Sequence, residues 1–441
     1  MEAASAYISW IMLLVSIGLV IIGCPVAIAL ASVGIIFAFF GWGTGLVSMF
    51  PDRIFTTMQS FELAAVTLFV LMGVILEGSG VSNLLFETLR LIFARVRGGL
   101  YYVILTLAIL LAACTGISGA SVVTLGMICL PVMMKYKYDK SLTAGLVCSG
   151  GGLAVIIPPS IMLVIYGPIA GLSVADLFTA ALVPGLLLAF SYFAYVWVKV
   201  RVQPHIAPEP TLEEKQIPIK QLAIMFCKSF LPTGIVIFGV LGSILFGLAS
   251  PTEAAGVGAL LSFLVALSYK SIKSWGAFLN ILYTTLRVCG MIMLIVVGAG
   301  LFTTVFIGLG GADLIKMYLL KLSGYPFILL CVMLGIVLFL GFFMDWIAIL
   351  YITAPVFRGV VTAMGWEPLW FAILFCITLQ ISYVTPPFSY SVFYLRGIAP
   401  KEMTLKDMYR GVSPFIPLQV GVLILIYFVP QISLWLVAAV K

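Results

Sequence analysis

Charged residues are scarce in this chain of 441 residues. Asp, Glu, Lys and Arg together make up 9% of it, whereas 63% of its residues are hydrophobic. A soluble globular protein carries about 25% charged residues, so the composition excludes that class. Apolar runs longer than the ~20 residues that cross a bilayer recur along the chain. We therefore predict an all-α polytopic membrane protein whose surroundings are the lipid bilayer.

Histidine and paired cysteines are also nearly missing. His205 is the only histidine, and none of the eight cysteines belongs to a CxxC or Cys/His pair. This pattern supports neither a disulfide framework nor a metal centre. An intramembrane enzyme built on Ser118 and Asp345 would lack a histidine base, so we predict no catalytic residues and no cofactor. The net charge of +7 is typical of loops that orient a membrane protein and does not indicate a nucleic-acid partner.

Two Pro-Pro pairs interrupt long apolar segments in nearly the same way. The first segment reads Ala154-Val155-Ile156-Ile157-Pro158-Pro159-Ser160, and the second reads Ser382-Tyr383-Val384-Thr385-Pro386-Pro387-Phe388. Two prolines in a row remove two N–H donors and end a helix. In lipid the freed carbonyl groups are tolerated only where they line a protein cavity. A matched break in each half of the chain is typical of a transporter with its site near the bilayer midplane.

The basic residues predict two re-entrant hairpins. Arg97 and Lys135 flank an apolar stretch that is interrupted by Thr115-Gly116-Ile117-Ser118-Gly119-Ala120-Ser121. Because the positive-inside rule places both flanks in the cytoplasm and each limb is too short to span, we expect hairpin 1 at 99–134. The second hairpin is expected at 325–357, entering from outside and broken at Asp345.

These features predict two inverted repeats. Repeat 1 covers 1–199, with scaffold helices, hairpin 1 and a broken helix at 142–171; repeat 2 covers 222–441, with scaffold helices, hairpin 2 and a broken helix at 367–396. Each repeat has about five transmembrane helices, and a cytoplasmic linker at 200–221 joins them. Gly23-Cys24-Pro25 is either a tight turn between two spans or a kink in one helix.

The helix ends at the hairpin tips and Pro-Pro breaks are the candidate binding groups. Carbonyls at helix C-termini suit a cation such as Na⁺, and N–H groups at N-termini suit an anion. Asp345 is either a cation ligand or an N-cap, and the two roles are compatible. The candidate residues fall into three sets: Thr115, Gly116, Ile117, Ala154, Ile157 and Pro159 for Na⁺ site 1; Asp345, Ile347, Ala348, Ser382, Thr385 and Pro387 for Na⁺ site 2; and Ser118, Gly119, Ser121, Ser160 and Ser389 facing the substrate.

Four motifs resemble one known family. Gly23-Cys-Pro-Val-Ala-Ile-Ala-Leu, Cys114-Thr-Gly-Ile-Ser-Gly-Ala-Ser-Val-Val-Thr, Ile156-Ile-Pro-Pro-Ser-Ile and Val384-Thr-Pro-Pro-Phe are similar to the large membrane subunit of tripartite ATP-independent periplasmic (TRAP) transporters. The resemblance implies an elevator-type architecture of the ion-transporter superfamily and Na⁺-coupled uptake across the bacterial inner membrane. It implies two partners, a small four-helix membrane subunit and a periplasmic substrate-binding protein. The family's two principal Na⁺ sites correspond to the hairpin and Pro-Pro residues above.

The chain departs from the family pattern at the hairpin tips. Many members have Ser-Gly-Ser at Thr115-Gly116-Ile117, an acidic residue at Ser121, and threonines at Ile347 and Ala348. Side-chain ligation is lost at these positions, which leaves the number of coupled ions open. The expected function is Na⁺-coupled uptake of a small organic anion, such as a carboxylate, oxo-acid or sulfonate. The alternative is a single-component Na⁺-coupled di/tricarboxylate transporter of the same superfamily, which needs no partner.

Overall fold

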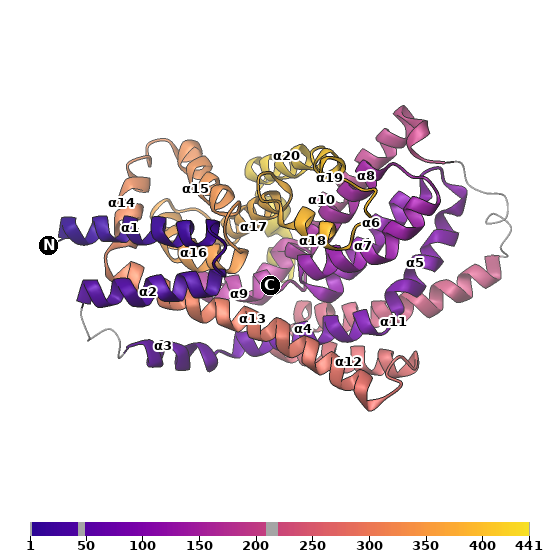
Figure 1. Ribbon diagram of the computed structural model, residues 1–441, viewed down its shortest axis with the longest axis horizontal. Coiled ribbons are helices and arrows are strands. Elements are labelled where there is room, and N and C mark those ends of the chain that lie inside the picture. The colour runs from indigo at the N-terminus through magenta and orange to yellow at the C-terminus, as the bar shows by residue number, and fades with distance from the viewer. Residues whose placement is uncertain (1, 43–48, 209–218, 441) are drawn as a thin grey trace.

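The computed structural model describes residues 2–42, 49–208 and 219–440, and every regular element in these ranges is a helix (Figure 1). Eight of the described helices are long and apolar enough to cross a membrane. Two of the eight, Ser118–Lys135 and Trp346–Ala363, are limbs of the expected hairpins, so the limb of hairpin 1 is longer than the sequence analysis expected. Helices satisfy all their backbone hydrogen bonds internally, which is what a lipid environment requires. The prediction of an all-α polytopic membrane protein is confirmed.

The described residues before the linker form ten α-helices. Their regular elements are α1 (Glu2–Ile21), α2 (Val26–Trp42), α3 (Met49–Met58), α4 (Phe61–Gly78), α5 (Val81–Ile92), η2 (Phe93–Arg95), α6 (Gly99–Thr115), α7 (Ser118–Lys135), α8 (Lys140–Gly152), η3 (Leu153–Val155), α9 (Ile161–Ala170), α10 (Val174–Val202) and η4 (Pro204–Ile206). Residues 209–218 of the expected linker lie outside the described residues.

The part after the linker continues with eleven helices. They are α11 (Ile219–Leu245), α12 (Pro251–Ser268), α13 (Trp275–Gly308), α14 (Gly311–Leu320), α15 (Pro326–Leu340), α16 (Trp346–Ala363), α17 (Pro368–Val384), α18 (Tyr390–Ile398), α19 (Leu405–Val412), α20 (Phe415–Phe428) and α21 (Gln431–Val440).

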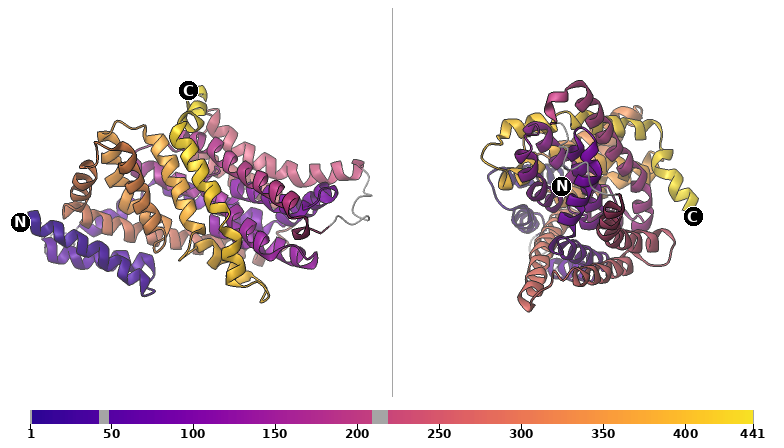
Figure 2. Two further views of the ribbon diagram at one scale, coloured as in Figure 1. Left: turned by 90° about the horizontal axis from the view of Figure 1, so that it is seen from above. Right: turned by 90° about the vertical axis from the view of Figure 1, so that its right-hand side faces the viewer.

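The segment at Gly23 is a turn. Helix α1 ends at Ile21, α2 begins at Val26, and Gly23 has a φ of +99°, a value that L side chains rarely adopt. The two helices lie side by side in Figures 1 and 2. The alternative of one kinked helix does not apply.

The two sequence halves pack across each other. Helix α2 lies against α13, and α4 lies against α12, so each half contributes one helix to both pairs. The same exchange occurs at the broken helices, where α9 packs on α16 and α18 packs on α7. The hairpins and breaks of both halves are therefore held in one body (Figure 1).

The core lies around the first segments of the two broken helices. Every residue of α8 from Leu142 to Gly152 is buried, and so is every residue of α17 from Leu369 to Val384. Glycines permit this packing on α8, because a Cβ at Gly151 would lie 2.8 Å from the backbone nitrogen of Val122 in α7. Residues with larger side chains would separate these helices.

Two elements differ from the sequence-based plan. Helix α3 was not expected, since it is short and mixes Asp52 and Arg53 with apolar residues. The last apolar stretch of the expected repeat 2, which the sequence predicts as one scaffold helix near 413–438, is divided into α20 and α21 at Val429-Pro430. Pro430 has no N–H to donate, and a proline clashes with the preceding turn, so the helix stops there.

Candidate functional site

The tip of the α6–α7 hairpin rests on the first Pro-Pro break. Helix α6 ends at Thr115, and Gly116 follows with a φ of +61°. The Gly116 carbonyl accepts a hydrogen bond from the Ile161 N–H at 3.4 Å, and a Cβ at Gly116 would lie 2.8 Å from the Pro159 carbonyl oxygen. Only glycine fits this close approach, so the sequence at the tip is dictated by the contact.

The tip is also tied together internally. The hydroxyl oxygens of Thr115 and Ser121 are 2.8 Å apart, and the Thr115 hydroxyl also donates to the Leu111 carbonyl at 3.0 Å. The structure thus brings Thr115, Gly116 and Pro159 together, as expected for Na⁺ site 1. Ser121 is fully buried and bonded to Thr115, so its hydroxyl is directed at the hairpin rather than at a ligand cavity.

The α15–α16 hairpin has a different tip. Asp345 is the N-cap of α16, and its carboxylate accepts a hydrogen bond from the Ile347 N–H at 3.1 Å. Gly341, after α15, lies so close to α17 that a Cβ there would overlap the Ser382 hydroxyl. The hairpin turn that carries Asp345 and Ile347 of the expected Na⁺ site 2 is thus packed through Gly341 against Ser382. The N-cap role of Asp345 is observed, and a cation role is compatible with it.

A serine closes each Pro-Pro break. The Ser160 hydroxyl donates to the Val155 carbonyl at 2.6 Å, and the Ser389 hydroxyl donates to the Tyr383 carbonyl at 2.8 Å. Both serines are fully buried, and both breaks contain a cis Pro-Pro bond. The hydroxyls thus pair with carbonyls left free where the helix stops.

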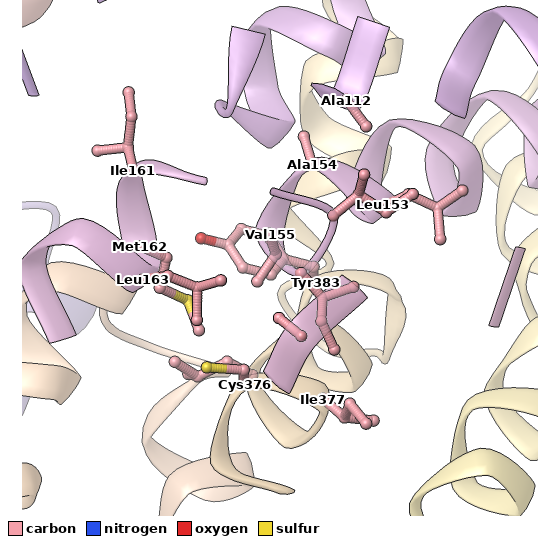
Figure 3. Packing of buried hydrophobic residues seen from close by; sticks show 14 of the residues in the cluster. Ala112, Leu153, Ala154, Val155, Ile161, Met162, Leu163, Cys376, Ile377 and Tyr383 are labelled. Carbon is pink, nitrogen blue, oxygen red and sulfur yellow. The ribbon is translucent and has the colours of Figure 1, made fainter. Parts of the chain in front are cut away.

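The residues around the first break also pack tightly with the second broken helix. Figure 3 shows η3 and the start of α9 close to side chains of α17, including Cys376, Ile377 and Tyr383. Ala154 of η3 lies near Ala112 of α6, and Ile157 packs against Gly185 of α10. Their side chains fill the core, so any contact of Ala154 or Ile157 with an ion would be made by the backbone.

Both hairpin tips border a single cavity of about 70 Å³. Helix α7 contributes Ser118 and Gly119, and the second tip contributes Asp345 and Ile347. The N-cap of α7, Ile117, makes no side-chain hydrogen bond, so the first N–H groups of α7 have no capping side chain. One tip therefore offers N–H donors, which suit an anion, and the other carries a carboxylate, which suits a cation.

Several predicted residues lie behind the cavity wall. Those that line it are Gly116, Ile117, Ser118, Gly119, Asp345 and Ile347. Those that do not are Thr115, Ser121, Ala154, Ile157, Pro159, Ser160, Ala348, Ser382, Thr385, Pro387 and Ser389. The Thr385 hydroxyl donates to the Ile381 carbonyl at 2.6 Å, and the Pro387 carbonyl accepts from the Tyr409 hydroxyl at 3.2 Å.

Two tyrosines and one scaffold helix line the cavity without having been predicted. Tyr383 and Tyr394 flank the second break, and a Cβ at Gly119 would lie 3.0 Å from the Tyr394 ring. The far wall is formed by α13, through Val288, Met291 and Ile292. Tyr383 and Tyr394 are polar-tipped residues beside a helix break, a signal that was visible in the sequence. The α13 residues carry no such signal.

No cluster of three or more His, Cys, Asp or Glu side chains among the described residues is placed to hold a metal ion. A cation at this site would rely on backbone carbonyls, hydroxyls and the single carboxylate of Asp345. Such oxygen ligands suit hard cations.

The fold and the site define a helical membrane transporter. The YdaH transporter of Alcanivorax borkumensis has a similar fold, with a TM-score of 0.59, 13% sequence identity, and coverage of 89% of this chain and 88% of that one. The chain belongs to the family of the tripartite ATP-independent periplasmic transporter DctM component, whose model matches residues 13–432. It is thus a large permease subunit of a TRAP transporter, and the resemblance seen in its motifs is confirmed.

Characterised relatives cover nearly the whole chain. It is 28% identical to the C4-dicarboxylate TRAP transporter large permease DctM of Pseudomonas aeruginosa, with 87% of each chain covered. It is also 28% identical to the 2,3-diketo-L-gulonate permease YiaN of Escherichia coli, with 94% of this chain and 96% of the relative covered. The isethionate permease DctMQ of Oleidesulfovibrio alaskensis is 26% identical; the match covers 94% of this chain and 64% of that relative.

Proposed function

We propose that this permease subunit takes up a small organic anion across the bacterial inner membrane, driven by a Na⁺ gradient. The observation that carries the proposal is the shared cavity, where the uncapped N-terminus of α7 faces the hairpin tip that holds Asp345. An anion and a cation bound there would lie within reach of each other's charge. The related permeases are named for C4-dicarboxylates, 2,3-diketo-L-gulonate and isethionate, which are all organic anions.

Cation binding would complete the anion site. In our proposal one Na⁺ binds where Gly116 meets Pro159, and a second binds between Asp345 and the end of α17. The first ion would hold the α6–α7 tip against the break, and this would keep Ser118 and Gly119 at the cavity. Na⁺ then acts as a ligand that shifts the population toward the substrate-binding form.

The movement we propose is an elevator. Hairpins and broken helices, α6–α9 and α15–α18, form the moving body, and α2, α4, α12 and α13 form the scaffold. The scaffold side of the cavity is the apolar surface of Val288, Met291 and Ile292. An apolar wall makes no directional hydrogen bonds, so a loaded site can slide past it without breaking any.

Two partners are proposed for the complex. One is a small four-helix membrane subunit, and the other is a periplasmic binding protein that delivers the anion. The DctMQ relative is longer than this chain, which leaves room in it for a second membrane segment. Exposed apolar side chains on α11, such as Leu231, Ile235 and Phe238, offer a surface for lipid or for that subunit.

The test is uptake by the complex in proteoliposomes, with and without an inward Na⁺ gradient. Succinate, a sulfonate and a sugar oxo-acid serve as probes, each supplied with its binding protein. Accumulation that requires the Na⁺ gradient is expected, and equal accumulation in its absence refutes the coupling.

Asp345→Asn tests the cation site directly. We expect the Na⁺ concentration for half-maximal uptake to rise about tenfold or more, because a charge–ion contact becomes a dipole–ion contact. Asparagine preserves N-cap geometry, so helix α16 is expected to form normally. The matched control is Asp313→Asn, at an exposed carboxylate in the first turn of α14, which should leave the Na⁺ dependence unchanged. Identical Na⁺ dependence in both variants contradicts a cation role for Asp345.

A further inference from the structure

A second cavity lies away from the hairpin tips. It has a volume of about 170 Å³ and is enclosed by the end of α9, the last turns of α16 and the start of α17. None of its lining residues also lines the hairpin-tip cavity. At ~10–15 Å³ of such volume for one water molecule, there is space for several waters or for a small organic anion.

Arg358 supplies the charge of this cavity. Its side chain lies against Gly171, where a Cβ would be 2.7 Å from one guanidinium nitrogen. Gly171 also has a φ of +70°, so two independent reasons keep this position free of a side chain. Among the described residues Arg358 has no ion-pair partner, and its guanidinium N–H donors are free for a ligand. Guanidinium groups bind carboxylates and other planar oxyanions through paired hydrogen bonds.

A phenol adds a neutral donor to the same space. Tyr166 is 3% exposed and lines the cavity, and its ring packs against Phe375 with 5.3 Å between centroids. Its hydroxyl has no hydrogen-bond partner among the described residues. The Tyr166 hydroxyl is therefore available to donate a hydrogen bond to a molecule bound in the cavity.

The charge that lines the cavity favours an anion. Lys316 of α14 lies beside Gly359, where a Cβ would be 3.4 Å from the lysine nitrogen, but Lys316 does not line this cavity and borders a separate surface hollow with Asp313. The carboxylate nearest in sequence to the cavity is Glu367, which is exposed at the start of α17. Among the charged side chains that the structure describes, Arg358 alone lines the cavity.

Arg358 also has a simpler role available. A cation at the end of α9 interacts favourably with the last carbonyls of that helix. That role explains the arginine, but it accounts for neither the open space nor the unbonded Tyr166 hydroxyl.

We propose that this cavity binds a small organic anion, a carboxylate or sulfonate, between Arg358 and Tyr166 before the anion reaches the hairpin tips. Arg358 is 13 residues after Asp345 on the same helix, which corresponds to about 20 Å. The sequence flanking hairpin 2 is expected outside, so the cavity would receive the substrate first. The proposal rests on anion uptake as the function of the permease.

The experiment measures charge selectivity at the cavity mouth. Thr362, an exposed residue of the lining, is changed to cysteine in a chain whose accessible Cys24, Cys227 and Cys331 are serine. The reconstituted complex, in K⁺ buffer without a gradient, is treated with a negatively or a positively charged methanethiosulfonate. We expect the negative reagent to react about tenfold faster than the positive reagent, once each rate is divided by the rate of the same reagent with a free thiol in solution. Succinate or methanesulfonate should slow the reaction of the negative reagent with the introduced thiol.

Arg358→Gln in the same background should abolish both the selectivity and the protection. Lys321→Gln is the matched control, because Lys321 lies over the Tyr318 ring at 4.6 Å and does not line this cavity. The proposal is overturned if the two reagents react at equal rates or if neither reacts. It is also overturned if Lys321→Gln loses the selectivity to the same extent as Arg358→Gln.

A second measurement uses transport. In the complex with its native cysteines, Arg358→Gln should raise the KM for the delivered anion several-fold, while kcat stays within twofold of the parent value. The Na⁺ concentration for half-maximal uptake should remain unchanged. A fall in kcat alone contradicts a capture site. Anion-selective labelling together with Na⁺-independent uptake would refute the coupling proposal and leave the cavity's role standing.

Discussion

Gly116 determines both the backbone conformation and the packing of the α6–α7 hairpin tip. It ends α6 with a positive φ and lies against the carbonyl of Pro159, so backbone conformation and packing both require glycine. The contact joins the tip to the Pro-Pro break, and this is the place where the first cation site is proposed. The positive φ of Gly116 and its lack of a Cβ therefore both allow the hairpin tip to contact the Pro-Pro break.

Gly116→Ala should therefore weaken both folding and cation binding. A non-glycine residue in the left-handed region costs about 1–2 kcal/mol, and the Cβ must also displace the Pro159 carbonyl. We expect a lower midpoint of thermal unfolding in detergent and a higher Na⁺ requirement for uptake.

Gly335→Ala is the control for this change. Gly335 is within α15, and a Cβ there meets nothing within 4 Å. Alanine favours a helix over glycine by up to about 1 kcal/mol, so this variant should be at least as stable as the parent. If the two alanine variants behave alike, the tip contact is not required.

At the scale of elements, the two broken helices are organised in the same way. Each runs inward as a fully buried helix, stops at a Pro-Pro pair, and is closed by a serine that bonds a carbonyl five or six residues back. The serine was expected to face the substrate. In the structure its hydroxyl completes the break, because a carbonyl released inside the core needs a donor.

Replacing these serines separates the two interpretations. Ser160→Ala and Ser389→Ala each remove a buried hydrogen bond, worth about 1 kcal/mol and more when the carbonyl stays unpaired. We expect lower thermal stability and a nearly unchanged KM for the substrate. Ser323→Ala, at an exposed position, should change neither. A raised KM with unchanged stability would instead support direct substrate contact.

At the scale of the whole molecule, the proposed scaffold contacts the proposed moving body through several helix pairs. Helix α4 packs on α6 and α9, and α13 packs on α16. The Glu77 carboxylate of α4 accepts a hydrogen bond from the Thr124 hydroxyl of α7, and this joins the two bodies directly. The elevator movement that we propose would have to break this bond in each cycle.

A reversible cross-link at this point should stop transport. In a chain without Cys24, Cys227 and Cys331, Glu77→Cys with Thr124→Cys places two thiols where a Hg²⁺ ion can bridge them. We expect Hg²⁺ to reduce uptake by more than tenfold, and excess thiol to restore it, because the bodies can no longer move past each other. Each single-cysteine variant is the control. Undiminished uptake by the cross-linked pair rules out relative movement of α4 and α7.

Many helix ends and several residues of the candidate site could be predicted from the local sequence. The Pro-Pro pairs end helices wherever they occur, and the glycine at 116 and the aspartate at 345 mark helix ends by their own chemistry. The same reasoning placed Gly116, Ile117, Ser118, Gly119, Asp345 and Ile347 at the site, and the cavity includes all six. Ser121, which was predicted to face the substrate, is instead bonded to Thr115 and does not line this cavity.

The sequence by itself determined that the chain crosses a membrane, that helices end at the two Pro-Pro pairs, and which family its motifs resemble, because composition and helix termination are local properties. Only the tertiary structure decided that the two tips share a cavity, that Tyr383, Tyr394 and α13 complete its wall, and that Arg358 meets Gly171 and Tyr166. These contacts join residues far apart in the chain. They depend on how the two halves pack across each other, which no local pattern records.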